Sequence, residues 1–184
     1  MRIKIIVEGE SDRIFLSNLI KFLKKQKIIK NSLKIEVEIS NGSKIINRRN
    51  IKKIIENAKE DNYERILILI DKKIELGSQF RSRDCLLDVK NIYKKKILNN
   101  VNNTIEVIVV DSEIECWFVL GSEKVKNFHI HCYENARELF GTNAKIQLAK
   151  RATTKLNLIF KNRNKNKSFN HFLRKIGVYD IKNM

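Results

Sequence analysis

The sequence predicts an α/β protein with a mostly parallel sheet flanked by helices, and three observations support this fold class. Short apolar runs alternate with segments whose apolar residues have helical spacing. The run ILILI at 66–70 is continuously apolar and IEVIVV at 105–110 is apolar except for Glu106, as in strands buried on both faces of a parallel sheet. Each of these runs is followed at once by an acid, Asp71 or Asp111. Strands that alternate with helices are typical of a parallel sheet with both faces covered.

The first sixty residues contain two expected strands and two expected helices. Segment 2–8 (RIKIIVE) predicts a strand, and segment 11–26 predicts a helix with Ser11 as its N-cap. Segment 33–40 (LKIEVEIS) alternates apolar and charged residues, which is typical of a half-exposed strand. Segment 44–60 predicts a basic helix with isoleucines along one side.

The remaining elements follow from the same patterns. Within segment 64–73 we expect a buried strand over 66–70 that ends in Asp71, followed by a loop at 75–82, a helix at 83–99, a strand at 105–110 and a short buried helix at 114–120. Beyond them we expect helix over 134–160 with a break at 141–143, a solvated basic loop at 161–168 and a final helix at 169–177. Trp117 and Phe118 are expected to pack in the core, and His171 to lie on a helix surface.

Length and charge limit the classes of protein that the chain can represent. Its 184 residues predict one domain, with a core over 1–120 and a mainly helical extension over 121–184 packed on that core. Since the chain has neither an apolar run of about 18 residues nor a signal peptide, we expect a cytoplasmic protein without membrane contact. The net charge of +17 favours a polyanionic partner, DNA or RNA. An AT-rich genome also enriches Lys, Ile and Asn, so the charge by itself leaves the partner open.

The three cysteines form no pattern that indicates a disulfide framework. Cys85, Cys116 and Cys132 stand at scattered spacings, which predicts buried or incidental thiols. His129 and His131 beside Cys132 have the composition of zinc ligands. No second ligand pair follows, however, and a closed structural zinc site takes four ligands. The interpretation as a strand or its edge is therefore favoured over zinc.

Acidic residues follow three of the expected strands. They are Glu8, Asp71 and the acids of segment 111–115. Because the carboxyl ends of parallel strands lie along one edge of a sheet, we expect these side chains in a single crevice, with Gly9 allowing a close turn after the first strand. Clustered carboxylates repel one another unless a partner neutralises them, and oxygen ligands suit Mg²⁺ or Mn²⁺. The sequence therefore predicts a metal site at this edge.

Three motifs in this order resemble a TOPRIM domain, the metal-binding core shared by topoisomerases, bacterial primases and several nucleases. They are VEGESD at 7–12, the apolar strand that ends in Asp71, and SEIECW at 112–117. With NKSFNHFLRKIG at 166–177, the chain looks most similar to small stand-alone TOPRIM proteins. Those are related to the overcoming-lysogenisation-defect (OLD) nucleases and to nuclease partners of ATPases in anti-phage defence. The resemblance implies a Rossmann-like fold over residues 1–120.

The resemblance also implies roles for individual acids. Glu8 matches the TOPRIM glutamate, which binds metal or acts as a general acid or base, and Asp12 matches the second acid of the E-G-x-x-D/E pattern. Asp71 matches the first aspartate of the D-x-D motif, while Glu113 and Glu115 match the acidic block after the next strand. All five are implied metal ligands. Three of them, Glu8, Asp71 and Glu115, are the implied catalytic residues.

The chain departs from the TOPRIM pattern at one position. The second aspartate of D-x-D would fall at residue 73, where this chain has Lys73, and a cation cannot ligate Mg²⁺. Either Asp71 serves the metal without it, or Glu75 or Asp111 substitutes, or the site is degenerate. Lys73 contacting a scissile phosphate is a further alternative.

Glu115 stands inside an apolar stretch, where a carboxylate without a partner is costly. We therefore expect a metal or a lysine beside it, with the metal favoured. Three lysines of the C-terminal half are candidates for a phosphate contact, and their positions do not distinguish them: Lys145, Lys150 and Lys155. Glu10 is expected to face solvent.

The expected function is Mg²⁺-dependent hydrolysis of phosphodiester bonds in DNA or RNA. The resemblance implies an effector of anti-phage defence that works with a separate ATPase, since this chain carries no P-loop of its own. The alternative is a non-catalytic TOPRIM-like module that binds nucleic acid or another protein, its metal site impaired by Lys73. Self-association is left open.

Overall fold

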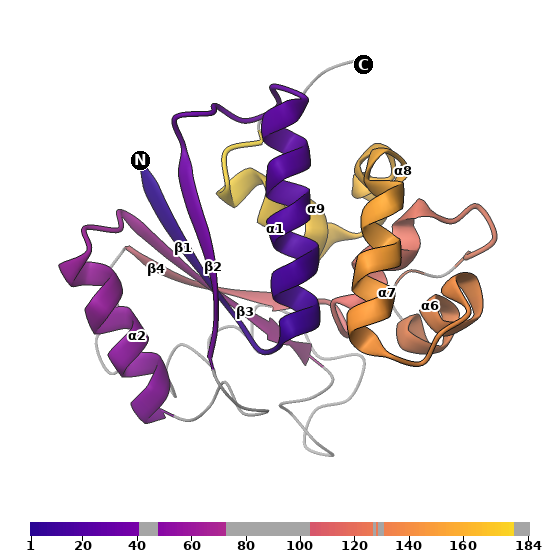
Figure 1. Cartoon of the computed structure of the whole chain (residues 1–184), viewed down its shortest axis with the longest axis horizontal. Coiled ribbons are helices and arrows are strands. Elements are labelled where there is room, and N and C mark those ends of the chain that lie inside the picture. Colours follow the sequence, from indigo (N-terminus) through magenta and orange to yellow (C-terminus); the bar gives the residue numbers. More distant parts are fainter. Residues whose placement is uncertain (41–47, 73–103, 127, 129–130, 179–184) are drawn as a thin grey trace.

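The computed structural model describes residues 1–40, 48–72, 104–126, 128 and 131–178, with side chains described from residue 53 onward in the second of these segments. The four strands within these residues lie in the order β2-β1-β3-β4, and each neighbouring pair is parallel. The strands are β1 (Arg2–Val7), β2 (Lys34–Ile39), β3 (Arg65–Asp71) and β4 (Ile105–Val110). For the described residues, the expected α/β architecture with a parallel sheet is confirmed (Figure 1).

The register of the sheet aligns the carboxyl ends of its strands at one edge. Ile6 of β1 is the partner of Ile68 of β3, and Asp71 of β3 is the partner of Val110 of β4. The continuously apolar run of β3 is buried on both faces, as its sequence predicts. Acids placed at the ends of β1 and β3 are therefore neighbours in space.

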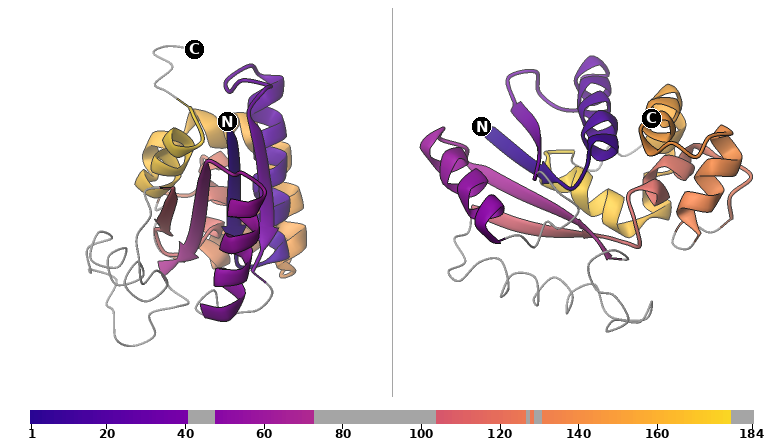
Figure 2. Two further views of the ribbon diagram at one scale, coloured as in Figure 1. Left: turned by 90° about the vertical axis from the view of Figure 1, so that its left-hand side faces the viewer. Right: turned by 60° about the horizontal axis from the view of Figure 1, so that its bottom comes forward.

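Helices cover both faces of the sheet (Figure 1, Figure 2). On one face, α1 (Glu10–Lys25) packs through Phe15, Leu19 and Leu23, whose spacing of four residues gives one apolar side of the helix. The final helix, α9 (Lys167–Lys175), joins the same core beside β4. On the other face, α2 (Arg48–Glu60) packs Ile55 and Ala58 against the opposite side of β3.

The predicted N-cap of the first helix is wrong. Because β1 ends at Val7, only Glu8 and Gly9 form the turn, and α1 begins at Glu10 with Gly9 in the N-cap position. Ser11 is buried in the first turn. Asp12 Oδ2 accepts the Gly9 N–H at 3.3 Å, which is the backward half of a capping box.

After β4 the described chain is helical in short segments. They are α5 (Glu115–Phe118), η2 (Val119–Gly121), α6 (Cys132–Phe140), α7 (Lys145–Ala152), η3 (Thr153–Lys155), α8 (Leu156–Lys161), η4 (Arg163–Lys165) and α9 (Lys167–Lys175). The expected break at 141–143 is confirmed, since Gly141 with φ +62° ends α6. The expected core positions of Trp117 and Phe118 are also confirmed, as both are fully buried. The predicted loop at 161–168 is wrong, because η4 and the start of α9 occupy most of it.

The C-terminal helices pack directly on the first part of the chain. α7 lies beside α1, and α9 lies against β4 (Figure 1). The division into a core over 1–120 and an extension over 121–184 stays a prediction. Within the described residues, no helix combines the length and the apolar character needed to cross a membrane.

Cys116 and Cys132 are buried, as predicted, but the prediction that they are thiols is wrong. The two residues form a disulfide, with their Cα atoms 4.8 Å apart, and it links α5 to α6. Their sequence separation is 16 and no spacing rule pairs them, so the bond depends on how α5 and α6 pack. Cys132 is therefore not a zinc ligand here, which agrees with the preference against zinc.

Several expectations lie outside the described residues. These are the loop at 75–82, the helix at 83–99 and the first residues of the helix at 44–60, together with Lys73, Glu75, Cys85 and His129.

Candidate functional site

The candidate site is an acidic cluster at the carboxyl edge of the sheet. Glu8 directly follows β1, and Asp71 is the last residue of the neighbouring strand β3. Asp12 lies in the first turn of α1, and Glu115 is the first residue of α5, which follows β4. We call these four residues the acidic cluster. Strand ends and helix starts thus bring together side chains that are far apart in the sequence.

Asp71 is the centre of the acidic cluster. It is buried, and burial raises the pKa of its carboxyl well above the ordinary value of 3.8. The charges of Asp12, Glu8 and Glu115 raise this pKa further, whereas Lys145 lowers it. All four neighbours are therefore close enough for their charges to act on Asp71, which is the arrangement that the sequence predicts.

The pKa of Asp12 is raised in the same way as that of Asp71. Burial, followed by the charge of Glu115, raises the pKa of its carboxyl from 3.8 to about 6. Two hydrogen bonds oppose this rise: the Ser11 hydroxyl donates to Oδ1 at 3.0 Å, and the Gly9 N–H donates to Oδ2. The cluster therefore has a higher proton affinity than isolated aspartates, because its carboxylates repel one another in a poorly solvated place.

Lys145 supplies the positive charge beside the cluster. Its Nζ lies 3.0 Å from Oε1 of Glu115, whose side chain is 1% exposed, while the lysine side chain is 48% exposed. Burial lowers the lysine pKa, but the charge of Glu115, its hydrogen bond and the charges of Asp71 and Glu113 outweigh this effect, so the pKa is raised overall. Lysine is unfavourable at the first position of a helix, where the dipole is positive. The ion pair with Glu115 compensates for that cost.

Of the three candidate lysines, the structure brings only Lys145 to the cluster. Lys150 is exposed on α7, and Nζ of Lys155 lies 5.8 Å from the centre of the Phe140 ring. The expected partner of Glu115 is thus present as a lysine. The metal that the sequence favoured for this role stays a prediction.

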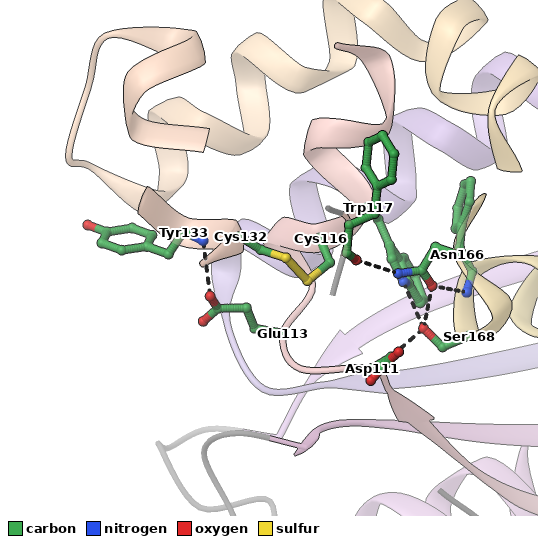
Figure 3. Close-up of a disulfide and its surroundings, with 10 residues drawn as sticks. Asp111, Glu113, Cys116, Trp117, Cys132, Tyr133, Asn166 and Ser168 are labelled. Carbon is green, nitrogen blue, oxygen red and sulfur yellow. Dashed lines mark hydrogen bonds between the residues drawn. A yellow bond between two sulfur atoms is a disulfide. The ribbon is translucent and has the colours of Figure 1, made fainter. Parts of the chain in front are cut away.

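Glu113 and Glu10 have other partners and are not part of the acidic cluster. Glu113 is buried and points toward α6, where its Oε1 accepts the Tyr133 N–H at 3.0 Å (Figure 3). Its charge also contributes to the raised pKa of Lys145. Glu10 pairs with Arg13 on the surface, as expected of a solvent-facing acid.

Two polar residues of the site region were missed by sequence reasoning. Ser168 and Asn166 are buried, and they connect α9 to the segment that carries Glu115 (Figure 3). Asn166 is the N-cap of α9, and its side chain accepts the Phe169 N–H at 3.0 Å. An asparagine directly before an apolar helical pattern is a cap signal that could have located this helix start.

The residues of the cluster fit a hard divalent cation in their chemistry. All donors are carboxylate oxygens, and Oε2 of the fully buried Glu115 has no hydrogen-bond partner among the described residues. Burial, followed by the charges of its acidic neighbours, raises the pKa of Asp71, and a bound cation would offset that repulsion. Within the same part of the chain, no three acidic, histidine or cysteine side chains already stand in the positions of metal ligands.

Comparison of the chain with protein-family models, with curated proteins and with solved structures finds no match.

Proposed function

We propose that this protein is a Mg²⁺-dependent nuclease of the TOPRIM type, which hydrolyses phosphodiester bonds in DNA or RNA. The observation that carries the proposal is that Glu8, Asp12 and Glu115 converge on Asp71. Such a cluster is costly in a folded protein unless it binds something positive. The chain around it has a net charge of +17, so the acids contrast with a surface suited to polyanions.

The acids have separate roles in this proposal. Asp12, Asp71 and Glu115 would hold the cation, and Glu8 would hold it as well or exchange a proton with the attacking water. Bound Mg²⁺ supplies charge neutralisation at the phosphate and an activated water. Lys145 pairs with Glu115 in the absence of metal. Because about half of the lysine side chain is exposed, its ammonium group can also meet a phosphate oxygen of the substrate.

The proposed substrate contact is mainly electrostatic. Lysine and arginine number 38 against 21 acids, and backbone phosphates are bound by such surfaces without regard to sequence. Binding is therefore expected to weaken steeply as salt rises. From the resemblance alone, we further propose a cytoplasmic effector of anti-phage defence with a separate ATPase.

A second candidate function is a non-catalytic module that binds nucleic acid or protein. The ion pair between Lys145 and Glu115 favours it, because the lysine already neutralises one of the carboxylates that a metal would need. In this case the cluster and Lys145 would form a structural network. Nucleic acid would then bind with no requirement for divalent metal.

A cleavage assay with matched acid substitutions tests the proposal. Plasmid DNA and structured RNA are incubated with Mg²⁺ or Mn²⁺ and with wild-type protein, Glu8→Gln, Asp71→Asn or Glu10→Gln. We expect cleavage by the wild type and a loss of about 100-fold or more for Glu8→Gln and Asp71→Asn. The control Glu10→Gln keeps its activity, because Glu10 pairs with Arg13 outside the cluster.

The same assay includes the result that contradicts the nuclease. Asp71→Asn relieves repulsion in the cluster, so it is expected to stay folded. If the wild type binds nucleic acid without metal, cleaves neither substrate and binds unchanged after both substitutions, the non-catalytic module is correct.

A further inference from the structure

We call segment 111–117 the acidic loop. Both of its ends are hydrogen-bonded to one oxygen atom. The backbone N–H of Asp111 donates to Ser168 Oγ at 3.0 Å, and Nε1 of Trp117 donates to the same oxygen at 3.1 Å (Figure 3). Ser168 lies on α9, more than fifty residues further along the chain. Glu113 and Glu115 stand between the two tied positions.

The hydroxyl group of Ser168 can accept both of these hydrogen bonds in one orientation only. A serine hydroxyl has one proton and two lone pairs. The proton is donated to Oδ1 of Asn166 at 2.8 Å, which leaves both lone pairs for Asp111 and Trp117. Every hydrogen-bonding capacity of the group is therefore used.

Asn166 fixes Ser168 in turn. Its Oδ1 accepts from Ser168 and from the Phe169 N–H, and its Nδ2 donates to the Phe128 carbonyl at 3.1 Å. Asn166 is 0% exposed and Ser168 4% exposed, so water does not compete for these bonds. Trp117 also packs against Phe169, with the ring centres 5.0 Å apart. The start of α9 is thus a rigid support for the acidic loop.

The acidic loop needs such a support. Ser112 has φ +69°, a left-handed conformation that is costly for a residue with a side chain and persists only where the surroundings impose it. Glu115 is a fully buried carboxylate, and a shift of the loop would change its distance from both Lys145 and Asp71. On the other side the loop is held by the Cys116–Cys132 disulfide (Figure 3).

We propose that Ser168 is a positioning residue for Glu115, and that Asn166 orients Ser168 for this role. The inference rests on the proposed function in one respect only: the placement of Glu115 matters for cation binding. Groups that orient metal ligands from behind usually change metal affinity when they are replaced. If Ser168 and Asn166 only begin α9 and fill the core, their loss affects stability and leaves the acidic loop and the affinity for cations unchanged.

The test uses the full chain with Ser168→Ala, Ser168→Thr and the control Lys167→Ala, whose side chain is exposed on the same turn of α9. The probe is Mn²⁺ alone, with the free ion measured by electron paramagnetic resonance. Ser168→Ala is expected to weaken Mn²⁺ binding about tenfold or more, as for other residues that orient ligands. Ser168→Thr restores the binding because it keeps the hydroxyl, and Lys167→Ala leaves it unchanged.

A second measurement needs no metal. In the metal-free protein, hydrogen exchange is followed at the Asp111 amide and at the indole of Trp117, the only tryptophan of the chain. Ser168→Ala is expected to remove the protection of both groups while the amides of β1 keep theirs. Trp117→Phe, which keeps an apolar ring but lacks the N–H, is expected to expose the Asp111 amide less than Ser168→Ala does.

The outcomes separate the inference from the proposed function. Unchanged Mn²⁺ affinity in Ser168→Ala, or an equal loss of protection in β1 and in the acidic loop, overturns the positioning role. If the wild type binds no Mn²⁺, the proposed function is wrong, and the exchange measurements decide whether Ser168 positions the loop. Local loss of protection then supports the inference, and unchanged protection overturns it.

Discussion

Replacing Asp12 by asparagine is expected to stabilise the metal-free protein at pH 8. In the folded chain the pKa of Asp12 is raised from 3.8 to about 6, whereas the unfolded chain keeps the ordinary value. Between these values the folded state binds more protons than the unfolded state, so stability falls as the pH rises through this window. Above about pH 6, Asp12 is ionised in both states and the full penalty is present. Asparagine has no charge and does not incur it.

The size of the effect follows from the same shift. A rise from 3.8 to about 6 corresponds to about 3 kcal/mol, at 1.36 kcal/mol for each pKa unit. The asparagine amide cannot accept both the Ser11 and the Gly9 hydrogen bonds, and losing one costs about 1 kcal/mol. We therefore expect a net gain of about 2 kcal/mol at pH 8 and none at pH 4 or below.

Urea unfolding at pH 4 and pH 8, with a chelator present, measures this difference. The matched control is Glu10→Gln, two residues away, which loses its pair with Arg13 and is expected to gain nothing at pH 8. Added Mn²⁺ should reverse the order, because a ligand at 100 times its dissociation constant stabilises the wild type by about 2.7 kcal/mol. If Asp12→Asn is no more stable than the wild type at pH 8, or is equally stabilised at both pH values, Asp12 does not face the other acids.

Two further predictions concern the surroundings of the cluster. Lys145→Met should lower the free energy of unfolding at pH 8 by about 2 kcal/mol. This value lies between those for a fully buried and for an exposed ion pair, because only Glu115 of this pair is buried. Lys150→Met on the same helix should change it by less than about 0.5 kcal/mol, and equal effects in calorimetry would refute the pairing. Reducing the Cys116–Cys132 disulfide should cost about 3 kcal/mol, because it closes a loop of about 16 residues. Urea unfolding with and without a reductant checks this, and identical curves would show that the bond is absent.

The core of the sheet could be predicted from the sequence because parallel strands have a strong local signature. Residues 66–70 are apolar without interruption, and β3 is buried on both faces along this run. The neighbouring positions of Glu8 and Asp71 follow from the same signature, since acids at the ends of adjacent parallel strands must share one edge. Ser11 was misplaced as a cap because the length of the turn after β1 is not encoded in periodicity.

Local sequence patterns are enough to predict the parallel sheet and the edge at which Glu8 and Asp71 meet. Both follow from the order of apolar and polar residues within single strands. Three further contacts are visible only in the folded chain: Lys145 pairs with Glu115, Cys116 bonds Cys132, and Ser168 holds the acidic loop by hydrogen bonds. These contacts join residues of different helices, and their formation depends on how those helices pack, a property that no local pattern of residues specifies.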